Sequence, residues 1–455
     1  MLDKSFLDRM KLILDDEYEE FLNALENRPP VRGARVNLVK CKGGEMPLID
    51  GYTHTALDYV DNGYIIEGDG AVGRHPAHHS GMIYIQDPGA MSALAALDIP
   101  SDAWVADLCS APGGKSSQVY ERLGEGGFLL SNEYVPKRAK IIVSNFERLG
   151  VTRAIVTSMD TSDLADLYTE VFDVVVVDAP CSGEGMFRKN SEAIEEWTPD
   201  APKICAKRQS EILKNAYRML KPGGKLLYST CTWSLEENEM TVLNMIDNYP
   251  DMKVIPVKDA LNSATSNGVM IEGRHELAYT RRCYPHKTEG EGQYVALLEK
   301  LGEGSVKRHF VYQDSTKKLS KDEERTVLAF FREVFDRVPE GRLAKVGENI
   351  VLIPHDCPVP SRSVFMAGVL VGDVRKGILH PSHQLFSAYG ALFKNREDLA
   401  QNDSRVMSYL DGNEIEAKEA KNGWCAVLYC GVALGGGKVS GGRIKNHYPK
   451  GLRNK

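Results

Sequence analysis

The run AWVADLCSAPGGKSS, residues 103–117, joins a short apolar stretch to a turn of small residues that ends in Gly-Gly-Lys. Gly114, Lys115 and Ser116 match the last positions of a mononucleotide phosphate loop. Cys109 replaces the first glycine of that loop, and Pro112 stiffens the turn, so the chain cannot wrap a phosphate in the usual way. A nucleoside triphosphate is therefore disfavoured, and another ligand must explain the loop.

The residues after this loop alternate apolar runs with helical segments. The runs are GFLLSNE (127–133), RAIVTSM (153–159), FDVVVVDAP (172–180) and GKLLYSTC (224–231). Short β-rich runs separated by helices are typical of a doubly wound parallel sheet, so the fold class is α/β. Two further runs, YTRRC (279–283) and QYVALLE (293–299), flank the turn TEGEG and predict a hairpin. The sequence thus predicts one domain of seven strands that ends near residue 300.

Other elements flank this predicted domain on both sides. Residues 6–25 show helical spacing of apolar side chains and predict a single helix that ends before Pro29-Pro30. The run SKDEERTVLAFFREVF (320–335) predicts another helix, and ENIVLIP (348–354) and FMAGVLVGDV (365–374) predict strands of a separate small unit. We therefore divide the chain into residues 1–75, 76–302, 303–385 and 386–455.

Composition limits the class of protein. The chain has 455 residues, of which 42% are hydrophobic and 26% charged, as expected for a globular protein of several domains. It has neither an apolar run of 18 residues nor a signal-peptide core, so we expect a cytoplasmic protein without membrane contact. The nine cysteines have an odd count and no C-x-x-C spacing, which predicts reduced thiols and no metal site.

Basic residues concentrate near the carboxyl end although the net charge is −7. From Lys438 onward the chain carries six Lys or Arg and no Asp or Glu, interspersed with apolar residues. This pattern predicts a folded basic surface that binds RNA phosphates through Lys438, Arg443, Lys445, Lys450 and Arg453. Near the other end, Arg32 and Arg35 lie in VRGARVNLVKCK, which fits a solvated edge or a small nucleic-acid contact equally well.

Two acidic residues indicate which ligand the first loop holds. Glu133 ends the second strand, where a carboxylate can accept hydrogen bonds from a ribose diol. Asp160 follows the third strand and could accept from an adenine amino group. A dinucleotide is disfavoured because residues 109–114 lack G-x-G-x-x-G. S-adenosylmethionine, a nucleoside cofactor without phosphate, fits best, although either acid alone could be a solvated loop residue.

Two cysteines end neighbouring strands of the predicted sheet. Cys181 follows the fourth strand and Cys231 ends the fifth, and neighbouring strands lie about 5 Å apart, so both thiols can face one reacting base. Pro180-Cys181 replaces the Pro-Pro-Tyr type of segment of many amino-methyltransferases, which favours methylation of carbon. A thiolate that adds to position 6 of a pyrimidine makes position 5 nucleophilic. Asp178 could then hydrogen-bond or protonate N3, and Lys115 could lower a thiol pKa or hold the base.

Either cysteine alone would more simply be a small buried apolar residue, but the pair beside Pro180 and Asp178 favours chemistry. The spacing leaves open which cysteine attacks. Three motifs, DLCSAPGGK (107–115), DAPCSGEG (178–185) and STCTWSLEENE (229–239), resemble the NOL1/NOP2/Sun family of RNA cytosine-5 methyltransferases over about residues 80–300. The flanking parts are similar, more loosely, to the bacterial F-type branch of this family, which acts on 16S ribosomal RNA.

The resemblance implies a fold, a reaction and roles for residues. Residues 76–302 would form a Rossmann-like class I methyltransferase domain, preceded by a small RNA-recognition segment (1–75) and followed by a linker domain (303–385) and a PUA-like α+β region (386–455). Cys231 would be the nucleophile and Cys181 would assist product release, with Lys115 and Asp178 at the base. The implied contacts to S-adenosylmethionine are Cys109, Ser110, Ala111, Pro112, Gly113, Gly114, Lys115, Glu133, Arg138, Asp160 and Asp178.

The expected activity is the formation of 5-methylcytosine in 16S ribosomal RNA, free or in the small ribosomal subunit, by a monomer. One alternative is a cytosine-5 methyltransferase that acts on tRNA. Another is a non-catalytic RNA-binding factor for ribosome assembly, which could have lost either thiol or Lys115, whereas this chain retains all three. Methylation of DNA is disfavoured by the basic carboxy-terminal region and by the Ser229 to Thr232 thiol site.

Overall fold

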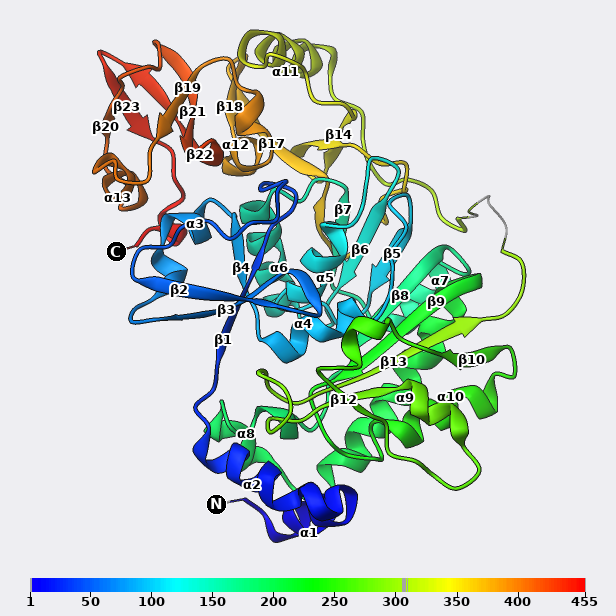
Figure 1. Ribbon diagram of the computed structural model, residues 1–455. Coiled ribbons are helices and arrows are strands. Elements are labelled where there is room, and N and C mark those ends of the chain that lie inside the picture. Colours follow the sequence, from blue (N-terminus) through cyan, green and yellow to red (C-terminus); the bar gives the residue numbers. More distant parts are fainter. Residues whose placement is uncertain (1, 305–307, 309, 455) are drawn as a thin grey trace.

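A computed structural model describes residues 2–304, 308 and 310–454. Its largest sheet has the order β11-β12-β13-β9-β8-β5-β6-β7-β16, and β10 also pairs with β13 (Figure 1). The parallel strands are β5 (Trp104–Asp107), β6 (Phe128–Asn132), β7 (Ala154–Thr157), β8 (Phe172–Asp178) and β9 (Leu220–Thr230). The antiparallel members are β10 (Met252–Ile255), β11 (Ser266–Asn267), β12 (Arg281–Cys283), β13 (Gln293–Lys300) and β16 (Val364–Ala367). The predicted parallel strands and the β12–β13 hairpin are confirmed.

Helices cover both faces of this sheet, which explains why its strands are apolar throughout. On one face, Leu94 of α4 (Pro88–Ala95) and Phe146 of α6 (Pro136–Leu149) share an apolar core with α5 (Gly114–Tyr120). On the other face, Leu164 of α7 (Thr161–Leu167) and Leu213 of α9 (Ala201–Met219) share a core with α10 (Glu239–Asn248). Because crossover helices alternate between the faces, the loops that carry functional residues gather at the carboxyl ends of the parallel strands.

The amino-terminal part contains two helices and a small sheet. The expectation of one helix over residues 6–25 is wrong: α1 (Lys4–Leu14) and α2 (Tyr18–Asn27) are separated by a tight 3₁₀ turn, Asp15–Glu17. Asp15 has a φ of 46°, and the turn brings three acidic side chains together, so a continuous α-helix is unfavourable there. The sheet order is β2-β3-β1-β4, formed by β1 (Arg32–Val36), β2 (Tyr52–Leu57), β3 (Val60–Gly68) and β4 (Ile83–Ile85), with α3 (Pro76–His79) before β4.

Residues after β13 form a second sheet of order β14-β15-β17-β18. The expectation that FMAGVLVGDV belongs to a separate small unit is only partly right, because its first half, β16, extends the large sheet by pairing with β7. Gly368 divides the run: its φ is 66°, and a side chain there would lie 2.3 Å from the Leu352 carbonyl oxygen. The elements are α11 (Lys321–Val334), as predicted, β14 (Arg342–Val346), β15 (Asn349–Ile353), β17 (Val369–Arg375) and β18 (Ile378–Pro381).

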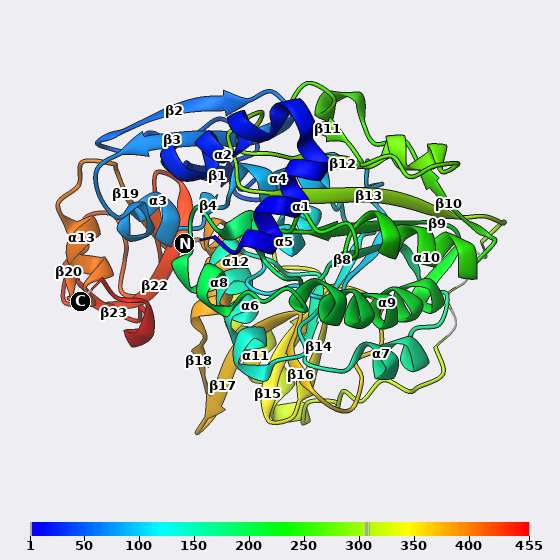
Figure 2. The ribbon, with the colours of Figure 1, turned by 90° about the horizontal axis from the view of Figure 1, so that it is seen from below.

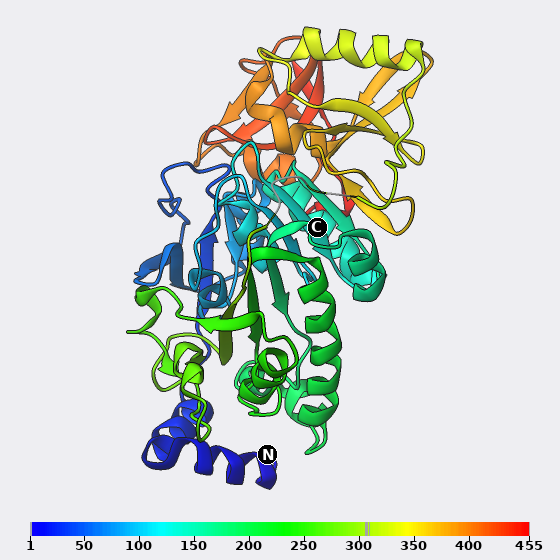
Figure 3. The ribbon, with the colours of Figure 1, turned by 90° about the vertical axis from the view of Figure 1, so that its right-hand side faces the viewer.

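The carboxy-terminal residues form a third small sheet of order β19-β21-β22-β23-β20. Its elements are α12 (His383–Tyr389), β19 (Arg396–Leu399), α13 (Arg405–Leu410), β20 (Ile415–Glu416), β21 (Gly423–Tyr429), β22 (Val432–Ser440) and β23 (Arg443–Asn446). Figures 1 and 3 place this unit and the β14–β18 sheet at one end of the molecule and α1 and α2 at the other. The large sheet lies between them. No helix of the described residues is long and apolar enough to span a membrane.

The side chain of Lys40 joins three parts of the chain. Lys40 follows β1, and its Nζ donates to the carbonyl oxygens of Ser80 at 2.7 Å and Arg148 at 2.8 Å. It also lies 3.2 Å from the Oγ of Ser387 on α12 and 3.4 Å from the carbonyl oxygen of Ala433 on β22. One amino group therefore satisfies acceptors from the amino-terminal unit, the large domain and the carboxy-terminal unit that contains α12 and β22.

Replacing Lys40 by methionine should destabilise the protein by about 1–3 kcal/mol, the usual cost of leaving buried carbonyl groups without a donor. Methionine keeps the apolar part of the side chain but cannot donate. The measurement is chemical denaturation followed by tryptophan fluorescence. The exposed Lys42 offers the matched control, since Lys42→Met removes the same charge without touching the junction. Equal stability of the two variants would show that the junction does not depend on Lys40.

Candidate active site

A cavity of about 700 Å³ opens at the carboxyl ends of the parallel strands. It receives residues from the loop after every one of them. From the predicted site it brings together Cys109, Ala111, Glu133, Arg138, Asp160, Asp178, Cys181 and Cys231. The predicted Ser110, Pro112, Gly113, Gly114 and Lys115 do not line the cavity. These five residues lie behind the lining residues, and their contacts, described below, position the lining residues.

The loop after β5 is folded tightly against α6. Gly113 has a φ of 108°, which favours glycine, and a side chain on Gly114 would lie 3.1 Å from the Tyr84 ring. The Ser110 hydroxyl donates to the carbonyl oxygen of Asp107 at 2.8 Å, and the Pro112 carbonyl accepts from α6. The glycines thus let the chain turn without side chains, and the loop presents Cys109 and Ala111 to the cavity.

Asp107, which the sequence analysis missed, anchors this loop from inside the sheet. The residue is fully buried at the end of β5, and burial raises its pKa to about 6. Its carboxylate accepts from the Ser116 hydroxyl at 2.6 Å and from the Cys109 amide at 3.3 Å. The available signal was an acid at the end of an otherwise apolar strand, which requires a buried partner.

Glu133 lies at the end of β6 with its side chain only 5% exposed. Its carboxylate accepts from the Val135 amide at 3.0 Å and lies 3.4 Å from the Arg138 guanidinium. Arg138 also donates to the carbonyl oxygen of Ala111 at 3.2 Å, which ties α6 to the first loop. Asp160 is exposed at the cavity and caps α7 by accepting from the Ser162 amide at 2.9 Å. Among the described residues, one carboxylate oxygen of Asp160 has no hydrogen-bond partner, whereas each oxygen of Glu133 already has one.

Lys115 acts on the site through Asp178. The Lys115 Nζ lies 2.9 Å from one carboxylate oxygen of Asp178, and the Ser229 hydroxyl donates to the other at 2.7 Å. Although burial opposes its charge, attraction to Asp178 raises the pKa of Lys115, which therefore remains an ammonium. The pair fixes the Asp178 carboxylate at the floor of the cavity, between the ends of β8 and β9.

The two predicted thiols lie next to each other. The Sγ atoms of Cys181 and Cys231 are 3.2 Å apart, and both residues are partly exposed. The hydrogen bond to Cys231, together with burial, raises the pKa of the Cys181 thiol well above its ordinary value. Cys181 therefore keeps its proton.

The cavity is also lined by residues that the sequence analysis did not single out, among them Tyr134, Arg208 and Ile212. Arg208 and Ile212 are four residues apart on α9, so they face the same side of that helix. Helical spacing alone could not reveal them, since it does not say which face of α9 turns towards the strand ends. Tyr134 directly follows Glu133, and the bulk of its ring is exposed at the cavity rim.

The amino-terminal helices cover the loops that carry the thiols. Phe6 of α1 and Phe21 of α2 pack with Trp233, two residues after Cys231, in one apolar core. Arg9 also donates to the buried Glu184 carboxylate, three residues after Cys181, at 2.5 Å. Figure 2 shows α1 and α2 nearest the viewer over this region. The amino-terminal unit thus reaches the site by packing, not only by surface charge.

One predicted RNA contact is wrong. Arg35 is fully buried in β1, and its guanidinium lies 2.9 Å from the Glu121 carboxylate. It also donates to the Ser117 hydroxyl at 2.7 Å and to the carbonyl oxygen of Gly114 at 3.2 Å. Arg35 therefore holds the start of α5 in place and has no free donor for a phosphate. Arg32, by contrast, is exposed.

The predicted basic residues lie on β22, on β23 and in the residues that follow β23. The exposed ones are Lys438 on β22, Arg443 and Lys445 on β23 and Lys450 beyond it. Arg453 is half-buried and donates to the carbonyl oxygen of Tyr448 at 3.3 Å. Lys455 lies outside the described residues. Lys438, Arg443 and Lys445 remain accessible on two paired strands, and Lys450 follows in a 3₁₀ turn, so the basic residues do not lie on a loose tail.

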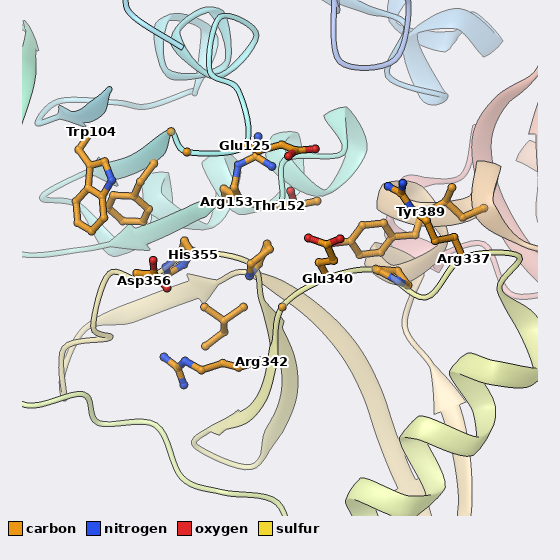
Figure 4. A pocket seen from close by; sticks show the side chains of 18 residues that line it. Trp104, Glu125, Thr152, Arg153, Arg337, Glu340, Arg342, His355, Asp356 and Tyr389 are labelled. Carbon is orange, nitrogen blue, oxygen red and sulfur yellow. The ribbon is translucent and has the colours of Figure 1, made fainter. Parts of the chain in front are cut away.

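A second cavity, of about 430 Å³, lies where the β14–β18 sheet meets the opposite ends of the parallel strands. Figure 4 shows Glu125 and Arg153 facing Arg337, Glu340 and His355 across it. Burial lowers the pKa of His355 to about 3, so its ring is neutral. Among the described residues that line this cavity, none belongs to the predicted site, and they form a polar junction between domains.

The described residues hold no cluster of three His, Cys, Asp or Glu side chains that could bind a metal ion.

The sheet order β7-β6-β5-β8-β9-β13-β12, with β13 antiparallel, and a cavity at the strand ends define a Rossmann-like methyltransferase. Three family models match: 16S rRNA methyltransferase RsmB/F over residues 94–299, the N-terminal domain of 16S rRNA methyltransferase RsmF over 2–88, and the methyltransferase RsmF PUA domain over 396–454.

Known relatives narrow the class. Ribosomal RNA small subunit methyltransferase F of Klebsiella pneumoniae (strain 342) is 30% identical over 468 residues, covering 99% of this chain and 96% of the relative. Its namesake from Erwinia tasmaniensis is 28% identical and covers 98% and 96%. The chain belongs to the ribosomal RNA small subunit methyltransferase F family. A solved methyltransferase homologue from Pyrococcus horikoshii, 28% identical, superimposes with a TM-score of 0.56 over 66% of this chain and 95% of that one.

Proposed function

We propose that this protein transfers a methyl group from S-adenosylmethionine to carbon 5 of a cytosine in 16S ribosomal RNA. We further propose that it acts in the cytoplasm as a monomer on the free RNA or on the small ribosomal subunit. Membership of the methyltransferase F family supports the substrate. The observation that carries the choice of carbon 5 is the pair of thiols, 3.2 Å apart, beside the Asp178 carboxylate in one cavity.

The residues of the cavity fit S-adenosylmethionine. Its volume of about 700 Å³ is in the range of cofactor sites. Glu133 would accept hydrogen bonds from the ribose diol and Asp160 from the adenine amino group, while the Cys109 loop presents no cradle for a phosphate. The bound cofactor would supply an electrophilic methyl group on its sulfonium. Arg138 would hold Glu133 in position, since the two lie 3.4 Å apart.

The nucleophile in this proposal is Cys231. Its thiolate would form a bond to carbon 6 of cytosine, and the electron pair of the 5,6 double bond would move to carbon 5. Carbon 5 would then take the methyl group as the sulfonium S–CH₃ bond breaks and S-adenosylhomocysteine is left. Asp178 would hydrogen-bond or protonate N3 and stabilise the adduct, and Lys115 fixes its carboxylate at 2.9 Å. Cys181, which keeps its proton, supports the assignment because it can stabilise the neighbouring Cys231 as a thiolate.

Product release requires loss of the proton on carbon 5 and elimination of the Cys231 thiolate. The proton on carbon 5 must leave to a base, its electron pair restores the 5,6 double bond, and the bond between Cys231 and carbon 6 breaks with return of the thiolate. We assign assistance in this step to Cys181, which lies against the Cys231 sulfur and so beside the breaking bond. Binding of the RNA itself we assign to Arg32 and to the exposed cations of the carboxy-terminal basic surface.

The test uses 16S ribosomal RNA transcribed with tritium at carbon 5 of cytosine. Methylation at that carbon releases one tritium into water for each methyl group incorporated, and bisulfite sequencing then locates the cytosine. The same assay with tRNA as competitor separates the two RNA classes. Methyl incorporation without tritium release would exclude carbon 5, and preference for tRNA would exclude the 16S assignment.

Replacing Glu133 by glutamine should weaken the binding of S-adenosylhomocysteine about 10- to 100-fold, because a ribose diol would lose hydrogen bonds to a charged acceptor. The amide preserves shape, so the fold should not change. Isothermal titration calorimetry gives the dissociation constant. Glu125→Gln is the matched control, since Glu125 lines the second cavity instead. Unchanged affinity in Glu133→Gln would remove this residue from the cofactor site.

A further inference from the structure

The backbone on both sides of Cys181 is held by side chains that the proposed mechanism does not use. The carbonyl oxygen of Pro180 accepts from the amide nitrogen of Gln209 on α9 at 3.0 Å. The backbone N–H of Ser182 donates to the carboxylate of Glu237 at 2.9 Å. The residue before Cys181 and the residue after it are thus both fixed, which determines where the thiol points.

The two side chains form one unit, the Glu237–Gln209 clamp. Gln209 donates to the Glu237 carboxylate at 2.9 Å with the same nitrogen that holds Pro180, and the Ser182 hydroxyl donates to it at 2.5 Å. Glu237 and Gln209 are both fully buried. Of the ion pairs among the described residues, none involves Glu237, so neutral donors alone solvate this carboxylate. A buried carboxylate without a cation is costly and calls for a function.

The clamp also reaches the loop of the second thiol. The Ser182 hydroxyl lies 2.8 Å from the hydroxyl of Thr232, the residue after Cys231. Gly185 donates its backbone N–H to the carbonyl oxygen of Cys231 at 2.9 Å, and a side chain on Gly185 would lie 2.9 Å from that oxygen. Glu237 is therefore connected to both cysteine-bearing loops, through one hydroxyl on each.

We infer that Glu237 is a positioning residue for product release: through the clamp it holds Cys181 against the bond between Cys231 and the methylated base. This inference rests on the proposed function. Glu237 then affects one of two steps. Attack requires only the Cys231 thiolate, whereas release also requires the Cys181 thiol beside it. Loss of the clamp should therefore slow release far more than methyl transfer.

The variant Glu237→Gln tests the clamp with little change of volume. The carboxylate accepts on both oxygens, whereas an amide offers one acceptor and one NH₂ donor. The Ser182 N–H and the Gln209 NH₂ share one oxygen of Glu237, and the Ser182 hydroxyl donates to the other. The single amide oxygen can therefore accept either from the two N–H groups or from the hydroxyl, and one side of the clamp loses its acceptor. Glu236→Gln is the matched control, since Glu236 is the adjacent residue and contacts only Ser234 among the side-chain hydrogen bonds of the described chain.

The measurements are single-turnover methyl transfer, multiple-turnover rate, and the fraction of enzyme bound covalently to RNA on a denaturing gel. For Glu237→Gln we expect a single-turnover rate close to that of the native protein and a multiple-turnover rate about 10- to 100-fold lower, with a covalent adduct that accumulates. Ser182→Ala, which keeps the backbone bond but removes the link to Thr232, should show the same change to a smaller extent. Glu236→Gln should behave like the native protein.

The outcomes distinguish this inference from the proposed function. If Cys181→Ala accumulates adduct but Glu237→Gln and Ser182→Ala turn over normally without adduct, the clamp has no role in release and the inference is overturned. If Cys181→Ala itself accumulates none, the proposed mechanism is at fault. If Glu237→Gln does not fold, Ser182→Ala decides, since it removes only one hydroxyl.

A pH profile gives a readout that a structural role alone would not change. Burial raises the pKa of Glu237 to about 7, and the titratable groups that face it are Glu184, Cys181, Tyr228 on β9 and Cys205 on α9. As pH falls through about 7 the carboxyl takes up a proton and loses an acceptor. The adduct fraction of the native enzyme should therefore rise on acidification. In Glu237→Gln the adduct fraction should be high at every pH and should not change with pH. A profile in Glu237→Gln identical to the native one would contradict the inference.

Discussion

Replacing Cys231 by alanine should abolish methyl transfer, with a fall in rate of at least about 10⁴-fold, as for the removal of a nucleophile from other catalytic units. Carbon 5 of cytosine becomes nucleophilic only after a thiolate has added to carbon 6, and in the proposed mechanism Cys231 supplies that thiolate. The measurement is tritium release from 16S ribosomal RNA labelled at carbon 5.

The control for this substitution is Cys205→Ala. Cys205 lies on α9, about one turn before the cavity residue Arg208, and does not line the cavity. It should retain native activity, which shows that removal of a neighbouring thiol is harmless in itself. S-adenosylhomocysteine binding should be unchanged in both variants. Residual tritium release by Cys231→Ala within tenfold of the native rate would exclude Cys231 as the nucleophile.

Replacing Cys181 by alanine should leave the protein covalently attached to its RNA. Cys231 can still attack and carbon 5 can still take the methyl group, but the thiol that lies 3.2 Å from the Cys231 sulfur is gone when the bond must break. We expect about one methyl group per enzyme and then arrest, with a band on a denaturing gel that disappears after nuclease treatment. Steady-state turnover should fall by at least about 10²-fold, which is the usual rate contribution of a positioned group that transfers a proton.

The double variant Cys181→Ala with Cys231→Ala is the control, because it keeps the RNA-binding surfaces but has no thiol to form the adduct. It should give no band on the denaturing gel. If Cys181→Ala turned over at the native rate, or if its adduct persisted without Cys231, the roles assigned to the two thiols would have to be exchanged or abandoned.

The sequence predicted the large sheet well because burial on both faces leaves a clear pattern. The run from Val174 to Val177 is apolar without alternation, which only a strand covered on both sides requires. The break at Gly368 was not predictable, since the run around it is apolar throughout and the sheet that each half joins depends on long-range pairing. Asp15 likewise interrupts a spacing that continues on both sides of it.

Part of the candidate site follows from topology alone. Cys181 and Cys231 end neighbouring parallel strands, so their approach could be expected before any coordinates. The wrong expectation concerned Arg35, because a charge in the sequence does not reveal whether it will find a buried partner. Its partner Glu121 lies 86 residues further on. Glu237 escaped notice for a related reason: in the sequence it is one of several acids in a row, and only the fold gives it three donors.

The pairing of β16 with β7 has a consequence for the order in which this protein can fold during synthesis. β7 ends at Thr157, whereas β16 begins at Val364, so most of the catalytic domain leaves the ribosome before the outer neighbour of β7 exists. Until then β7 is an open edge with unpaired backbone groups, the part of a sheet that is most prone to wrong association. The catalytic sheet is thus closed by a strand from the carboxy-terminal half, and a nascent chain must protect that edge until translation reaches it.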